Sequence, residues 1–217
     1  MVAAVRARGR SRLVFVLVPG LVALLGGCGA MAGWQLGVFN SDGRFEDVDA
    51  CRILPDAATL ATLVSNGGRE PGDSEPRGFL GLGGDAQSEC KWSSVPRGVD
   101  RPFRTVRVFA ETVHASPGGS GPERAKEDLA RWYENRVRRG SQVSVVDGAE
   151  KIYGATDRAS YVIVFARVEV FDIHAKFRIS NVVVDVSART HTEPGEKERA
   201  QVVGLARNVA ARLRALD

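Results

Sequence analysis

The three histidines of this 217-residue chain are the side chains best suited to act as metal ligands or general bases. His114, His174 and His191 lie on three different segments, and none belongs to an H-x-x-x-H or C-x-x-C spacing or to a serine or aspartate motif. The glycine-rich stretches 81–84 and 118–121 lack the Gly-Lys-Ser/Thr ending of a phosphate loop, and no G-x-S-x-G motif is present. The sequence therefore predicts no catalytic residue, metal or cofactor, and such a site would require distant segments to converge.

Adjacent aromatic residues are the best remaining candidates for contact with a ligand or partner. Trp132 and Tyr133 lie in the middle of an expected helix, where one ring should face the sheet and the other a groove or solvent. Trp92 is expected in the core, beside Cys90. A cleft next to the segment 67–87 could hold a small apolar ligand, although no residue in the sequence requires one.

Cys51 and Cys90 form an even pair in the part of the chain expected to be exported, where an oxidising environment favours disulfides. The sequence therefore predicts a disulfide between them. It would close a loop of 39 residues, which corresponds to roughly 4 kcal/mol of loop entropy.

The N-terminal segment determines the expected location of the chain. Residues 1–12 carry four arginines, and residues 13–39 are uncharged and mostly apolar. A helix of this length reaches roughly 40 Å, enough to span a hydrocarbon core of about 30 Å. Because arginine-rich flanks stay in the cytoplasm, residues 1–12 are the predicted cytoplasmic arm and residues 13–39 the membrane anchor. Residues 40–49 are the predicted tether, and residues 50–217 the extracytoplasmic domain at the cell membrane.

Two alternatives to the anchor stay open. Residues 13–25 have the length of a signal-peptide core, and Leu25-Gly26-Gly27-Cys28 resembles a lipoprotein cleavage site, which would place a lipid on Cys28. A fully secreted form is the other alternative. The apolar residues that follow Cys28, among them Trp34 and Phe39, favour the anchor, because mature lipoproteins more often continue with a polar tether.

Gly29, Gly33 and Gly37 repeat a G-x-x-x-G spacing twice within the membrane segment. Such a face allows two membrane helices to approach closely, so the sequence suggests a homodimer through these glycines. Abundant glycine in this segment is the simpler explanation of the same spacing.

The net charge of +4 comes entirely from the N-terminal arginines. The remainder of the chain carries 26 basic and 26 acidic residues, and this balance gives no signature of nucleic-acid binding. About 178 residues follow the membrane segment, which is enough for one domain with a substantial core.

The spacing of apolar residues predicts an α+β domain, with an antiparallel sheet packed against helices. We expect the following order: a helix over 54–64, a mobile loop over 67–87, strands over 89–93 and 104–114, a helix over 121–139, a strand over 142–146, two or three strands within 160–190, and a helix over 196–216. Ser120 and Glu123 form a capping box before the second helix, whose inner stripe is expected to include Val137. The turn within 160–190 is expected at Ser180-Asn181 or near Asp172.

Several stretches resemble a family of actinobacterial lipoproteins and anchored envelope proteins of unknown function. They are Cys51-Arg52-Ile53-Leu54-Pro55, Cys90-Lys91-Trp92, the Gly-x-Thr-Asp stretch 154–157 and the alanine-rich C-terminal helix. The resemblance covers roughly residues 47–216, and some relatives have a fold similar to the photosystem protein PsbP. It implies a compartment, a disulfide and a fold, but no reaction.

These observations lead to one expected function and one alternative. The chain is expected to be a membrane-anchored extracytoplasmic module of the cell envelope that binds an envelope protein or a small apolar ligand and has no enzymatic activity. The alternative is a hydrolase or a carrier of a small apolar ligand, with a site that the sequence does not reveal.

Overall fold

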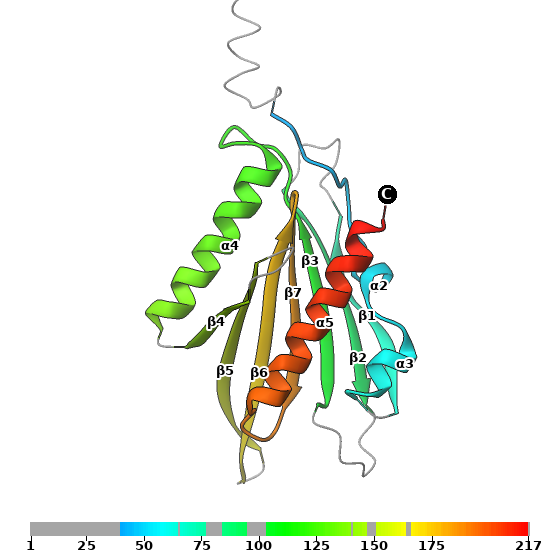
Figure 1. The fold of residues 1–217 in the computed structure, drawn as a ribbon, viewed down its shortest axis with the longest axis vertical. Helices are drawn as coiled ribbons and strands as arrows, with labels where there is room; N and C mark the ends of the chain where they lie inside the picture. Colours follow the sequence, from blue (N-terminus) through cyan, green and yellow to red (C-terminus); the bar gives the residue numbers. More distant parts are fainter. Residues whose placement is uncertain are drawn as a thin grey trace, which may run out of the picture.

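The computed structural model describes residues 40–64, 66–76, 84–94, 103–139, 141–146, 151–163 and 166–216, which form one antiparallel sheet with helices (Figure 1). The strands lie in the order β1-β2-β3-β7-β6-β5-β4. Their bounds are β1 Gly67–Glu75, β2 Ala86–Ser94, β3 Thr105–Thr112, β4 Gln142–Val146, β5 Ile152–Ile163, β6 Ala166–Ile179 and β7 Val182–Thr190. The helices are α2 Ala50–Ile53, α3 Ala57–Ala61, α4 Gly121–Arg138 and α5 Glu196–Arg214. The predicted α+β class is confirmed.

The predicted N-terminal segments cannot be compared with this fold. Residues 1–39, with Cys28 and the glycine face of Gly29, Gly33 and Gly37, lie outside the described residues. In the part of the chain that is described, no helix is both long and apolar enough to cross a membrane.

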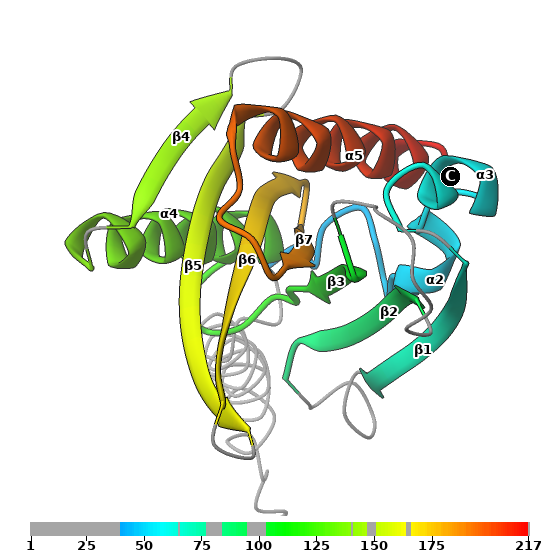
Figure 2. The same ribbon diagram turned by 90° about the horizontal axis from the view of Figure 1, so that it is seen from below.

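Alternation along the strands builds the main core on one face of the sheet. On β3 the buried side chains of Val106 and Val108 alternate with half-exposed neighbours, and Cys90 and Trp92 do the same on β2. Helix α5 packs on this face and crosses it diagonally, with α2 and α3 beside it (Figures 1 and 2). The predicted apolar stripe of α5 is confirmed, because Val202, Leu205, Val209 and Leu213 are all buried.

Helix α4 begins where the sequence predicts. The Glu123 carboxylate accepts hydrogen bonds from the backbone N–H and the hydroxyl of Ser120, at 3.2 and 2.8 Å. Ala125 of α4 packs with Val113 and Val183 in a small second cluster. The predicted inner position of Val137 is wrong: this side chain is 51% exposed, because the last turn of α4 extends beyond the packed part of the helix.

The helix predicted over 54–64 is shorter, because only α3 falls within that range, and the short helix α2 before it was not predicted. Leu54 adopts an extended conformation (φ −60°, ψ 131°), as residues before a proline commonly do, so Pro55 separates α2 from α3. The Asp49 carboxylate caps α2 by accepting from the N–H of Cys51 at 2.8 Å. Cys51 is joined to Cys90 of β2 by a disulfide, which ties α2 to the sheet.

The prediction of a loop over 67–87 is wrong at both ends, and its last two residues begin β2. Residues 67–75 form the edge strand β1, which pairs with β2 and changes register between Pro71 and Ser74. The strand has no apolar residue in an alternating pattern, because it lies at the edge and little of it is buried. At Gly67 an added Cβ would lie 2.1 Å from Nε1 of Trp92, so the indole requires glycine there. Residues 77–83 lie outside the described residues.

The segment 160–190 contains the end of β5 followed by β6 and β7, and the turn between β6 and β7 lies at Ser180-Asn181, one of the two predicted positions. Ser180 has a left-handed backbone (φ 52°), which suits the tight connection between β6 and β7. Asp172 lies inside β6 and makes no turn, and the stretch 154–157 belongs to β5 rather than preceding the long strands.

Residues 40–49, predicted to be a tether, pack against the domain. Phe45 and Val48 are buried, and Asn181 binds this segment through its side chain. The Asn181 amide donates to the carbonyls of Phe45 and Val113, at 2.8 and 3.2 Å, and its oxygen accepts from the N–H of Phe45 at 3.1 Å. Gly43 approaches so closely that an added Cβ would lie 2.5 Å from the Asn181 side chain.

Candidate functional site

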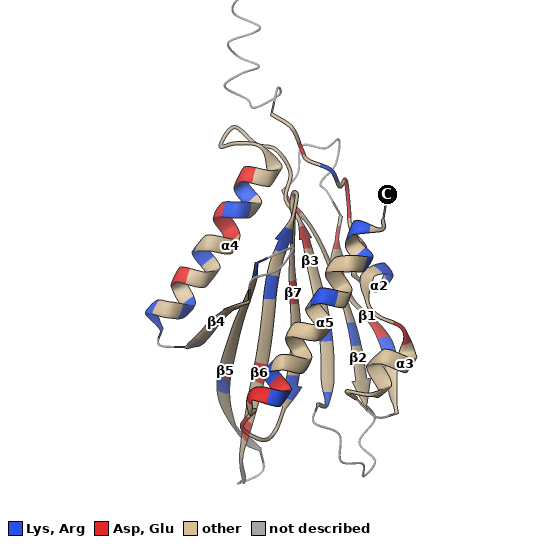
Figure 3. Ribbon diagram, in the orientation of Figure 1, with Lys and Arg blue, Asp and Glu red and all other residues tan. Residues whose placement is uncertain are grey.

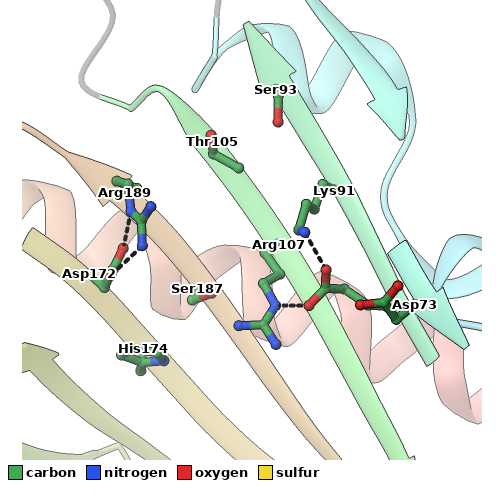
Figure 4. Close-up of a pocket in the computed structure, with 10 residues that line it drawn as sticks. Asp73, Lys91, Ser93, Thr105, Arg107, Asp172, His174, Ser187 and Arg189 are labelled. Atoms are coloured by element: carbon green, nitrogen blue, oxygen red, sulfur yellow. Dashed lines mark hydrogen bonds and ion pairs between the residues drawn. The ribbon is translucent and has the colours of Figure 1, made fainter. Parts of the chain in front are cut away.

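A polar hollow lies on the sheet face opposite α5. We call it the polar groove: a cavity of about 480 Å³ lined by side chains from β1, β2, β3, β7 and β6 (Figure 4). These side chains alternate with the buried ones that pack on α5, so that Lys91 lies between Cys90 and Trp92, and Arg107 between Val106 and Val108. Apart from Asp73, which lies at the irregularity of β1, the side chains of the groove come from residues paired with a neighbouring strand.

A charge network occupies the side of the groove formed by β2 and β3. The Glu89 carboxylate pairs with Lys91 of its own strand, 2.5 Å away, and with Arg107 of β3. Partial burial alone would raise the pKa of Glu89, but the hydrogen bond from Lys91 and the two positive charges hold that pKa below its ordinary value. Glu89 is therefore an ionised carboxylate at neutral pH.

A second ion pair lies across β6 and β7. Arg189 donates two hydrogen bonds to Asp172, from Nε and Nη2, both at 2.8 Å. The two residues lie directly opposite each other in the antiparallel register. Such a bidentate pair fixes the plane of the guanidinium and so gives the surface a defined pattern of donors and acceptors.

His174 lies at the centre of a third cluster. Its Nδ1 is 3.1 Å from both carboxylate oxygens of Asp185 on β7, and its Nε2 is 3.6 Å from Oδ2 of Asp157 on β5. Asp157 also pairs with Arg136 of α4. Burial alone would raise the pKa of Asp185, but the hydrogen bond from His174 and nearby positive charges hold that pKa below its ordinary value of 3.8.

This shift predicts how stability depends on pH. Because the pKa of Asp185 is lower in the folded chain, its contribution is present above the ordinary aspartate range and is lost as pH falls through the folded value. We expect Asp185→Asn to lower the free energy of unfolding by about 2 kcal/mol at neutral pH. The difference from wild type should shrink as pH falls below about 4. Urea unfolding across this range measures it, and a difference that does not change with pH would contradict the assignment.

Serine, histidine and aspartate meet on this face but do not form an activated nucleophile. Ser187 lies opposite His174 in the register of β6 and β7, and Figure 4 shows the two side by side. Both ring nitrogens of His174, however, face carboxylates, and among the described residues no hydroxyl is hydrogen-bonded to the ring. A serine nucleophile needs that bond to transfer its proton.

The other histidines do not join this cluster. His114 is buried beneath residues 40–49, where its Nε2 is 3.5 Å from Asp47, and His191 is exposed beyond β7. Within the described ranges, no group of three or more His, Cys, Asp or Glu side chains is placed to hold a metal ion.

The aromatic pair predicted as a contact site packs between α4 and the sheet. The Trp132 ring has the Arg136 guanidinium 5.1 Å and the Lys176 ammonium 5.5 Å from its centroid. The Tyr133 ring lies 5.0 Å from that of Tyr153. Both residues are half-buried, and neither ring belongs to the lining of the polar groove.

The sequence contained a signal for the groove that the search for motifs missed. Polar and charged residues at every second position of a strand in the middle of a sheet indicate a polar face that lies outside the main core. Asp172, His174 and Lys176 follow this spacing on β6, and Asp185, Ser187 and Arg189 follow it on β7.

Comparison with known proteins found no matching family model, no matching curated sequence and no matching solved structure. The resemblance to actinobacterial envelope proteins therefore stays a prediction.

Proposed function

We propose that this chain is a membrane-anchored, extracytoplasmic binding module of the cell envelope, and that it binds a protein partner through the polar groove without catalysing a reaction. One observation carries the proposal: an open hollow of about 480 Å³ presents paired charges of both signs on the strands of the sheet. Side chains on paired strands keep their geometry better than side chains on loops, which suits recognition.

The chemistry of the groove favours a polar partner over a small apolar ligand. Its lining combines lysine, arginine, aspartate and glutamate with the hydroxyls of Ser93, Thr105 and Ser187. A protein surface of mixed charge can exchange ion pairs with such a lining, and this kind of complementarity determines specificity and the rate of association. An apolar ligand would desolvate these charges without replacing their partners, at a cost in free energy.

A hydrolase is the alternative, and the His174–Asp185 pair is the observation that favours it. A histidine oriented by a partly buried carboxylate is half of a catalytic arrangement. The missing half is a nucleophile bonded to Nε2. Reproducible turnover of an ester, peptide, phosphate or glycoside substrate that is lost in His174→Gln would replace the binding proposal with this one.

Charge reversal tests the binding proposal. Arg107→Glu places a second carboxylate beside that of Glu89. It should reduce recovery of the envelope partner with the tagged full-length chain by about tenfold, the effect of a charge-pair loss of roughly 1.4 kcal/mol. Arg207→Glu is the matched control, because Arg207 is exposed on α5, on the other side of the sheet. Equal recovery with both variants would contradict the proposal.

A further inference from the structure

A second hollow, which we call the cationic pocket, lies where α4 meets the end of the sheet. It has a volume of about 500 Å³ and contains three basic side chains: Lys126 of α4, Lys151 just before β5, and Arg178 of β6. Leu129 and Ile179, both buried, contribute to an apolar floor. The pocket shares no lining residue with the polar groove.

The charge of the cationic pocket differs from that of the polar groove. None of the described residues that line it is acidic, so its three positive charges have no carboxylate within the lining. Arg178 is oriented by its own hairpin, because Nη1 donates to the carbonyl of Ser180 at 2.6 Å. The ammonium groups of Lys126 and Lys151 are on exposed side chains. Blue bands in Figure 3 mark the basic residues at this end of β6. Such an arrangement suits a phosphate group.

The position of the cationic pocket points to the source of that phosphate. Ser180, which lines it, accepts a hydrogen bond from the N–H of Arg44 at 3.2 Å. Five residue steps separate Arg44 from Phe39, the last residue of the predicted membrane segment, and they span at most about 17 Å. Figure 1 shows the blue segment that precedes α2 and the turn between β6 and β7 at the same end of the domain. The cationic pocket therefore lies within reach of the headgroup layer beside a membrane anchor.

We infer that the cationic pocket binds the phosphodiester headgroup of an anionic phospholipid at the surface of the membrane that holds the chain. The three cations pair with the phosphate, and the apolar floor receives the glycerol backbone and the first acyl carbons. Each basic residue near an anionic surface strengthens binding about fivefold. The inference rests on the membrane location proposed above but not on the partner of the polar groove, so either can fail without the other.

Lysine footprinting of the full-length chain tests this inference. The chain is placed in nanodiscs of phosphatidylcholine alone, or of equal parts phosphatidylcholine and phosphatidylglycerol, and is treated with an amine-reactive reagent. We expect Lys126 and Lys151 to react about fivefold more slowly in the anionic discs, because the headgroup pairs with their ammonium groups. Lys91 in the polar groove and Lys197 at the start of α5 are internal controls and should react equally in both.

Two further measurements test whether the phosphate that protects the lysines belongs to a lipid. Arg178→Ala should reduce the protection of both lysines in anionic discs, whereas Arg207→Ala should leave it unchanged. Inorganic phosphate added to phosphatidylcholine discs should give no comparable protection. Equal labelling of Lys126 and Lys151 in the two kinds of disc would overturn the inference. Protection by free phosphate alone would overturn it as well and would indicate a site for a soluble phosphate compound.

Discussion

Replacing Asn181 by alanine should lower the free energy of unfolding by about 4 kcal/mol. The side chain is fully buried and makes three hydrogen bonds to the backbone of Phe45 and Val113, which join the segment 40–49 to the turn between β6 and β7. Alanine leaves these backbone groups without their partner in a place that water does not reach, and each such group costs about 1–3 kcal/mol. Urea unfolding of the full-length chain measures the loss.

The control for this prediction is Asn208→Ala on the exposed face of α5. Because surface substitutions usually change stability by about 0.5 kcal/mol or less, this variant should resemble wild type. If Asn181→Ala were as stable as Asn208→Ala, the segment 40–49 would not be held to the domain by Asn181.

Removal of the disulfide should have an effect of similar size. Replacing Cys51 and Cys90 together by alanine releases a constraint between residues 39 apart in sequence, which corresponds to about 4 kcal/mol of chain entropy in the unfolded state. The cavity left at the fully buried Cys90 adds to this loss. Urea unfolding measures this loss from the midpoint together with the slope, because removal of the cross-link also changes the surface that the unfolded chain exposes.

Reduction provides the check on the double substitution. Wild-type protein unfolded in the presence of a thiol reductant should approach the stability of the Cys51→Ala, Cys90→Ala variant, because both lack the same cross-link. If the reductant lowered the stability of the double variant equally, the effect would not come from this disulfide.

The polar groove and the cationic pocket lie toward different ends of the sheet. Ile179 and Val182, beside the cationic pocket, pair at the end of the sheet where residues 40–49 pack. Thr105 and Arg189, in the polar groove, pair near the opposite end of β3 and β7. A headgroup bound in the cationic pocket would therefore hold that end at the membrane and leave the polar groove open toward a partner further out.

Local patterns predicted most of the elements where burial alternates along the chain, as it does on β2 and β3. The alternation of Val106 and Val108 with charged neighbours predicted β3, and the capping residues of α4 predicted where that helix begins. The sequence did not predict β1, because an edge strand is held by backbone pairing and needs no alternating apolar side chains. Gly67 and Pro71 read as loop residues, yet both pair with β2.

The pairing of charged residues across β6 and β7 in the candidate site follows from the sequence. Once the turn is fixed at Ser180-Asn181, every β6 residue lies opposite the β7 residue equally far from the turn, which places Asp172 opposite Arg189. The approach of Asp157 to His174 could not be predicted in this way, because it depends on the register between β5 and β6. That register follows from a connection with no turn signal as clear as Ser180-Asn181.

Site-specific crosslinking tests the central claim most directly. A photoreactive phenylalanine analogue placed at Thr105, inside the polar groove, is compared in intact cells with the same residue placed at Arg207 on α5. The binding proposal predicts a discrete crosslinked protein from position 105, weakened by Arg107→Glu, and none from position 207. The same crosslinks from both positions, or none from position 105, would contradict the proposal that the polar groove binds a protein partner.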